Sequence, residues 1–189
     1  MDIFEYTAVL TSIIIGLGIT HLLRGIAGLI QQPEKVRLYW VHLLWVGYLF
    51  FTLVFWWWWE FRLGSVETWT FHLYLFVVFY AFILFLASAL VFPLSLEGYA
   101  DYHDYFYSRR RWLFGIIALS YAVDLVDTML KGEGYLSTLG TEYLLSVPIQ
   151  FGLCLVAMWT RNRYFHGAFA IAMFVYQASY AFRTFETIT

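Results

Sequence analysis

The stretch of sequence that decides the fold is Trp69–Pro93, which reads WTFHLYLFVVFYAFILFLASALVFP. It contains no Asp, Glu, Lys or Arg, and a proline ends it. A helix rises about 1.5 Å per residue, so this stretch is long enough to cross the roughly 30 Å hydrocarbon core of a bilayer. An uncharged apolar run of this length predicts a transmembrane helix.

The composition of the whole chain agrees with this prediction. Of the 189 residues, 62% are hydrophobic and 13% are charged, whereas a soluble domain has about 45–50% apolar and about 25% charged residues. Six spans of about 20 residues would need about 120 residues, which is close to the hydrophobic content. We therefore expect one all-α domain over residues 1–189, a polytopic integral membrane protein in a lipid bilayer. The six expected spans are residues 4–30, 38–61, 69–92, 112–130, 142–160 and 164–184.

The longest polar stretch, residues 95–111, predicts an amphipathic helix on the cytoplasmic surface of the membrane. Its acidic residues recur at helical spacing and would form one face: Glu97, Asp101 and Asp104. Its aromatic residues would form another: Tyr99, Tyr102 and Phe106. The arginines at 109–111 could then meet anionic headgroups. A metal site with His103 is the alternative, but carboxylates on one helix face do not close a coordination sphere.

The distribution of basic residues predicts the orientation. Eight of them fall on one side of the predicted spans: Arg24, Lys35, Arg37, Arg109, Arg110, Arg111, Arg161 and Arg163. Three fall on the other: Arg62, Lys131 and Arg183. Because cytoplasmic loops are rich in Lys and Arg, we expect both termini outside the cytoplasm, in a bacterial inner membrane. The acidic start of the chain is unlike a cleaved signal peptide, so the first segment is expected in the mature protein.

Several classes of function are excluded at this stage. A net charge of −2 provides no basic surface for nucleic acid. A single cysteine, Cys154, excludes an internal disulfide, a CxxC redox pair and a cysteine-rich zinc site. The loops are short and contain no phosphate-binding glycine motif. We therefore expect no enzyme, and any site must be built by the helices themselves.

The strongest candidates for a functional site are two aspartates of the fourth segment, Asp124 and Asp127. A carboxylate in the bilayer centre costs about 2.5–3.5 kcal/mol on insertion scales, so it needs protein, water or a partner around it. Counted along the helices, Gln150 and Gln177 reach a similar depth, so we expect one polar layer around Asp124. Asp127 is expected to pair with Arg183. The layer would serve as a proton or ion relay or a polar substrate site, and a purely structural network is the alternative.

A second polar cluster lies in the inner halves of the first two segments: His21, Arg24 and His42. Two such histidines could be the axial ligands of a b-type haem. Histidines that hydrogen-bond between helices are the commoner alternative. No other cofactor and no metal is expected.

Four consecutive tryptophans, Trp56–Trp59, end the second predicted span. Four indoles cannot all face protein at one level, so we expect some of them at the lipid headgroups as an aromatic belt. The alternative is an aromatic cage for a quaternary ammonium ligand, with Glu60 beside it.

The first span carries a ridge of small residues four positions apart: Ala8, Ser12, Gly16 and Thr20. In lipid, small residues let two helices approach closely. The ridge therefore predicts tight packing against another helix of this chain. A second copy of the chain or a membrane partner subunit is the alternative occupant.

From these features we expect a small multi-pass membrane protein that acts as a channel, transporter or sensor through a polar site around Asp124. Two alternatives stay open. One is a structural or partner-binding subunit of a membrane complex, which would use the small-residue ridge. The other is a membrane oxidoreductase subunit that holds haem or quinone through His21 and His42.

Overall fold

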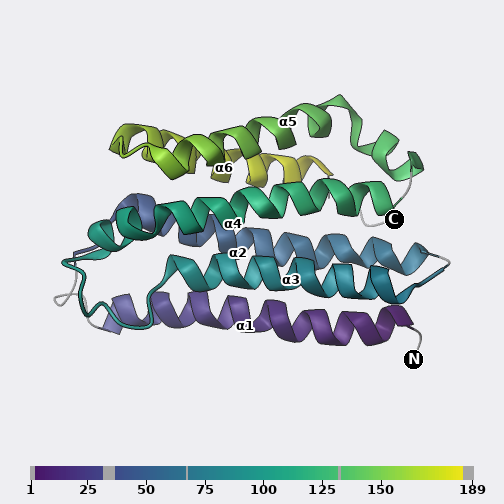
Figure 1. The fold of residues 1–189 in the computed structure, drawn as a ribbon, viewed down its shortest axis with the longest axis horizontal. Coiled ribbons are helices and arrows are strands. Elements are labelled where there is room, and N and C mark those ends of the chain that lie inside the picture. The colour runs from purple at the N-terminus through teal and green to yellow at the C-terminus, as the bar shows by residue number, and fades with distance from the viewer. Residues whose placement is uncertain (1–2, 32–36, 67, 132, 185–189) are drawn as a thin grey trace.

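The structure, a computed structural model, describes residues 3–31, 37–66, 68–131 and 133–184. Within these ranges the chain is all helical, as predicted, and forms a bundle of long helices (Figure 1). The elements are α1 (Ile3–Gln31), α2 (Trp40–Trp59), the short 3-10 helix η1 (Glu60–Ser65), α3 (Phe71–Val91), α4 (Tyr102–Leu130), α5 (Glu133–Trp159) and α6 (Arg163–Thr184).

Five of the helices, α1 to α5, are long and apolar enough to cross a membrane. In α5 the stretch that qualifies is Leu139–Trp159. The sixth predicted span does form a helix, α6, of 22 residues. Its described residues contain no stretch as apolar as the five candidate spans, because arginines lie near both of its ends and because His166 and Gln177 interrupt its apolar residues.

Successive helices run in opposite directions, so the start of α1 and the end of α6 point to the same end of the bundle (right in Figure 1). α3 packs between α1 and α4, and α4 packs between α3 and α5. α2 and α6 form a second row, in which α2 also contacts α1, α3 and α4. We call the end that holds the start of α1 and the end of α6 the terminal end of the bundle.

The two groups of basic residues lie toward opposite ends of this bundle. Lys131 follows the last residue of α4, at the terminal end, and Arg183 lies in the last turn of α6. Arg161 and Arg163 belong to the connection between α5 and α6, at the opposite end. Lys35, which the sequence assigns to that larger group, lies outside the described residues. The bundle therefore separates the charges as the sequence predicts.

The predicted surface helix over residues 95–111 is wrong. Residues 95–101 form turns and bends, and α4 begins at Tyr102 and continues unbroken to Leu130. Asp101 caps α4, since its extended backbone places its carboxylate 2.9 Å from the backbone N–H of Asp104, which donates to it. The expected membrane-facing aromatics are instead buried in the bundle, with Tyr102 and Phe106 only 8% and 2% exposed. This burial favours one long helix.

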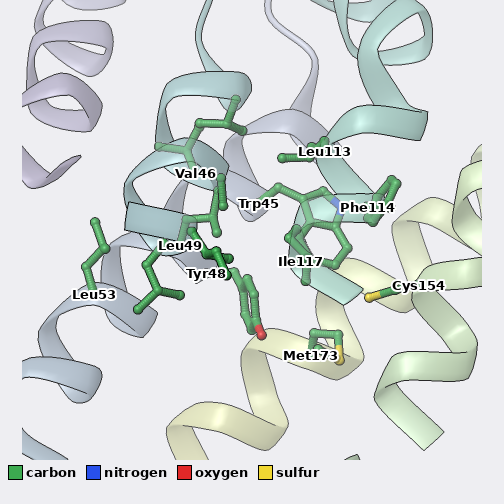
Figure 2. Close-up of a cluster of buried hydrophobic side chains, with 14 of the residues drawn as sticks. Trp45, Val46, Tyr48, Leu49, Leu53, Leu113, Phe114, Ile117, Cys154 and Met173 are labelled. Carbon is green, nitrogen blue, oxygen red and sulfur yellow. The ribbon is translucent and has the colours of Figure 1, made fainter. Parts of the chain in front are cut away.

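Aromatic side chains fill the bundle between α2, α4 and α6 in the half away from the terminal end. Trp45 is fully buried and lies edge-on to Phe114 and Phe169, with ring centroids 4.9 and 5.2 Å apart. Figure 2 shows Trp45 and Phe114 together with Ile117 of α4. The same view shows Tyr48 leaving this cluster toward α6, with its hydroxyl at the far end. Tyr48 therefore brings a hydroxyl group to the edge of this aromatic cluster, while buried apolar residues such as Leu53 and Val77 continue the core beyond it.

The small-residue ridge of α1 does not form its packed face. The buried residues of α1 are Thr7, Thr11, Ile15, Gly18 and Leu22. Ala8, Ser12 and Gly16 are half-buried along the edge of that face, and Thr20 is exposed. A Cβ added to Gly16 would meet nothing within 4 Å. Gly16 thus makes no tight contact within the described chain, and packing of the ridge on a second copy or a partner stays a prediction.

The close approach of α1 and α3 depends instead on Gly25. A Cβ on Gly25 would lie 2.3 Å from Cδ2 of Phe92, a ring that is only 2% exposed. We expect Gly25→Ala to destabilise the protein by about 1–3 kcal/mol through overpacking. Gly16→Ala is the matched control, because both changes gain the same helix propensity, and it should be neutral or stabilising. Thermal unfolding of the purified variants measures the difference. Equal stabilities would show that Phe92 does not lie against Gly25.

Candidate functional site

A cavity of about 190 Å³ lies between the helices, and its lining residues place it in the half of the bundle near its terminal end. Side chains of α2, η1, α3, α4, α5 and α6 line it. Nine of the lining residues are aromatic and three are acidic. The aromatic ones are Tyr48, Phe55, Trp56, Trp59, Tyr80, Tyr121, Tyr143, Tyr176 and Tyr180; the acidic ones are Glu60, Asp124 and Asp127.

Asp124 lies at the centre of a hydrogen-bond network that joins three helices. The hydroxyl of Tyr80, on α3, donates to its Oδ1 at 3.0 Å. The hydroxyl of Tyr143, on α5, donates to its Oδ2 at 2.7 Å. Thr128 lies 2.8 Å from the Tyr143 oxygen and donates to it, since the phenolic proton is already engaged. Two donors on one carboxylate stabilise its charged form.

Gly140 sets the position of Tyr143. Its φ of 68° and ψ of −174° break the helical path of α5, and glycine adopts such a positive φ at little cost. The bend separates the first turns of α5 from the long segment that carries Tyr143. Tyr143 therefore faces α4 from the first turn after the bend.

The other two acids share one ammonium group. Lys131 Nζ lies 2.6 Å from Asp127 Oδ2 and 3.1 Å from Glu60 Oε1. All three side chains are 3–7% exposed. We call this group the buried ion cluster. Two carboxylates and one ammonium leave it short of positive charge, and Glu60 Oε2 and Asp127 Oδ1 have no hydrogen-bond partner among the described residues.

The structure brings most of the predicted polar layer together. Asp124, Gln150 and Gln177 all line the cavity, from α4, α5 and α6. Gln177 does not bond Asp124; its amide donates to Thr52 Oγ1 of α2 at 2.9 Å. Gln150 lines the cavity without a bond to either. The three residues of the predicted layer thus line the same cavity, although the two glutamines do not bond Asp124.

The predicted pairing of Asp127 with Arg183 is wrong. Arg183 forms a two-pronged ion pair with Glu142 at 2.7 and 3.0 Å, in which both side chains are about half exposed. Asp127 is 3% exposed and pairs with Lys131, four residues later on the same helix face. The prediction compared depth alone, whereas the direction of each side chain around its helix decides the pairing.

The four tryptophans divide between the interior and the surface. Trp56 and Trp59 line the cavity, while Trp57 and Trp58 are 41% and 44% exposed. Trp56 lies edge-on to Tyr80 with ring centroids 5.4 Å apart. Trp59 stacks on Tyr180 at 6.0 Å. An aromatic belt formed by the exposed pair stays a prediction.

The cluster of His21, Arg24 and His42 does not fit a haem. His42 is 1% exposed, and its Nε2 donates to the carbonyl of Val91 at 2.6 Å. His21 Nε2 lies 3.3 Å from the carbonyl of Phe92, and the Phe92 ring contacts both imidazoles. Arg24 is exposed. Both histidines therefore bridge α3 to its neighbours, and they do not face a common space that could hold a planar cofactor.

Sequence reasoning missed the partners of the acids. Lys131 enters the predicted topology only as a basic residue of a loop. Its spacing of four from Asp127 is nevertheless the signal of an ion pair on one helix face. Tyr80 and Tyr143 carry no comparable signal, because the chain has 15 tyrosines and none of their spacings marks these two. Within the described residues, no group of three or more His, Cys, Asp or Glu side chains is arranged to hold a metal ion.

The chain matches no protein-family model, and neither the curated proteins nor the solved structures compared with it gave a match.

The buried ion cluster predicts a large effect of removing its cation. We expect Lys131→Met to destabilise the protein by about 3–5 kcal/mol, because two carboxylates are left without compensation in the interior. Adding Asp127→Asn to that variant removes one of those charges and should recover part of the loss. Arg183→Met is the control, since its exposed ion pair with Glu142 should contribute little.

Unfolding of the three variants by heat or denaturant is the measurement. If Lys131→Met unfolded like Arg183→Met, the cluster would not be a buried ion pair.

Proposed function

We propose that this protein is a multi-pass membrane protein that binds a small polar solute in the cavity around Asp124, as a transporter or a sensor. The observation that carries the proposal is the cavity itself. It places a hydrogen-bonded carboxylate and two further acids inside a bundle of apolar helices. Ionisable groups at such positions are expensive in a membrane and are functional by default.

The outer surface of the bundle supports a membrane environment. On α1, Val9, Ile13 and Leu17 are each more than half exposed, although they lie in the middle of an apolar helix. Water-soluble proteins rarely expose large apolar side chains in a contiguous row along a helix. Lipid tails would cover this face without cost.

The filled half of the bundle favours a transporter or a sensor over an open channel. Trp45, Phe114 and Phe169 occupy the space between the cavity and the opposite end. Packed aromatic side chains thus close the cavity on the side away from the terminal end. In a transporter with alternating access, these packed helices would move apart during the cycle. In a sensor, they would stay packed.

The cavity then lies in the half of the protein that faces away from the cytoplasm. The basic residues predict that the terminal end of the bundle is external, and the residues that line the cavity lie in the half of the bundle near that end. A solute would therefore reach Asp124 from outside.

Reporter fusions test the orientation. We expect a fusion after Thr189 to be active only outside the cytoplasm, and one inserted near Pro33 only inside, because the basic residues predict six crossings with external termini. A pair of fusions that are active on the same side would contradict this arrangement.

Solute binding at Asp124 is tested by thermal stability. A ligand that binds only the folded protein stabilises it by RT ln(1 + [L]/Kd), about 2.7 kcal/mol at 100 times Kd. We expect at least one of choline, proline, lactate and glycerol, which cover the charge classes at this size, to raise the melting temperature, and the rise should grow with the logarithm of its concentration above Kd.

The variant Asp124→Asn should fold, since an amide can still bond both tyrosines, but it should lose most of that stabilisation. Asp104→Asn is the control, because Asp104 is exposed at the far end of α4. If all four solutes left the protein unchanged, or if Asp124→Asn kept the full response, the proposal would fail.

A further inference from the structure

Aromatic rings from α2, α3 and α6 line the cavity. The Trp59 ring stacks on Tyr180, which in turn stacks on Tyr176 with ring centroids 6.1 Å apart. Trp56 and Tyr80 meet edge to face on the neighbouring wall. Ring faces carry negative potential, and Trp attracts cations most strongly. An aromatic lining of this kind is typical of sites for alkylated ammonium ions.

The ionisable carboxyl groups that line the cavity outnumber the one ammonium group that lies against them. Three carboxyl groups line it, and its described lining contains no Lys, Arg or His. Lys131 lies between Glu60 and Asp127 and is outside the lining. Arg183 lies over the ring of Tyr180, but its charge is matched by Glu142. An anionic solute would therefore be repelled.

Two residues of the lining, Glu60 and Asp127, each hold one buried acceptor atom without a partner. Glu60 Oε2 and Asp127 Oδ1 belong to side chains that are 7% and 5% exposed, and neither atom has a hydrogen-bond partner among the described residues. Buried acceptors that remain unpaired are costly. A positive charge in the nearby cavity would stabilise these carboxylates through space, whereas another acceptor would not.

Calcium and magnesium do not suit this lining. Calcium and magnesium take six or more oxygen ligands, and the cavity wall is mainly carbon. The volume of about 190 Å³ exceeds the roughly 150 Å³ that holds a benzene molecule. It is enough for an organic ion with a few carbon atoms.

We infer that the cavity binds a small alkylammonium ion about the size of choline, which Trp56 and Trp59 contact through their ring faces and Asp124, Asp127 and Glu60 attract by charge. This inference rests on the proposed solute site and names its ligand class. The inference goes further than the proposed function because the ligand must carry a positive charge. A neutral ligand of the same shape or polarity would not meet this requirement.

The experiment compares choline with 3,3-dimethylbutan-1-ol, in which carbon replaces the nitrogen and the charge is lost while the shape is kept. Calorimetric titration of the purified full chain gives both dissociation constants. We expect choline to bind about tenfold or more tightly than the alcohol, which corresponds to one desolvated cation–π contact. Sodium chloride at equal concentration is the control for ionic strength.

Matched tryptophan variants locate the site. Trp59→Leu should weaken choline binding about tenfold, because it removes one ring face. Trp57→Leu should leave it unchanged, since Trp57 is the exposed neighbour. Asp124→Asn should also weaken binding; its amide can bond both tyrosines if one hydroxyl accepts in place of donating. This second variant shows whether a loss of binding in Trp59→Leu comes from a folding defect.

Each other outcome has a definite meaning. Equal affinity for choline and the alcohol would overturn the inference in favour of a site that reads shape alone. Choline binding that survives both Trp59→Leu and Asp124→Asn would place the cation elsewhere and overturn it too. If choline fails while proline, lactate or glycerol stabilises the protein through Asp124, the inference falls and the proposed solute site stands. If none of these solutes binds, both fall.

Discussion

The structure depends on how an apolar bundle accommodates three carboxyl groups. Burying a charge without a partner costs more than most single interactions can offset. Here Asp124 receives two tyrosine hydroxyls, and Lys131 lies between Asp127 and Glu60. These contacts connect α3, α4, α5 and the start of η1. The polar groups thus fix how the helices sit against one another at one end, while aromatic packing fixes the other end.

The two halves of the bundle have opposite roles as a result. Around Trp45 and Phe114, large rings pack against one another, and the Nε1 of Trp45 is buried without a hydrogen-bond partner among the described residues. Around Asp124, tyrosines replace phenylalanines, and their hydroxyls turn the same kind of ring into a hydrogen-bond donor. Tyr48 stands at the boundary, with its ring in the packed cluster and its hydroxyl against that of Tyr121.

The helices were predictable because apolar runs of span length have few alternatives. The position of Asp124 in a polar layer was also predictable, since depth follows from the count of residues along a helix. The depth of a residue along its helix did not predict the partner of Asp127, because Arg183 at that depth points to the exposed Glu142. The surface helix failed for a related reason. Periodicity identified an aromatic face at Tyr102 and Phe106, but it could not say whether lipid or the bundle would cover that face.

The order of the network along the chain has a consequence for biogenesis. α4 brings two acids into the bundle, and the side chains that meet them come from both earlier and later segments. Tyr80 and Glu60 precede α4, so both are already synthesised when Asp124 and Asp127 leave the ribosome. Lys131 follows at once, whereas Tyr143 arrives with the next helix. Synthesis from the N-terminus therefore makes Tyr80 and Glu60 available before α4, the helix with two buried aspartates, has to be inserted. A permuted chain that began with α4 would lack these two partners at that moment.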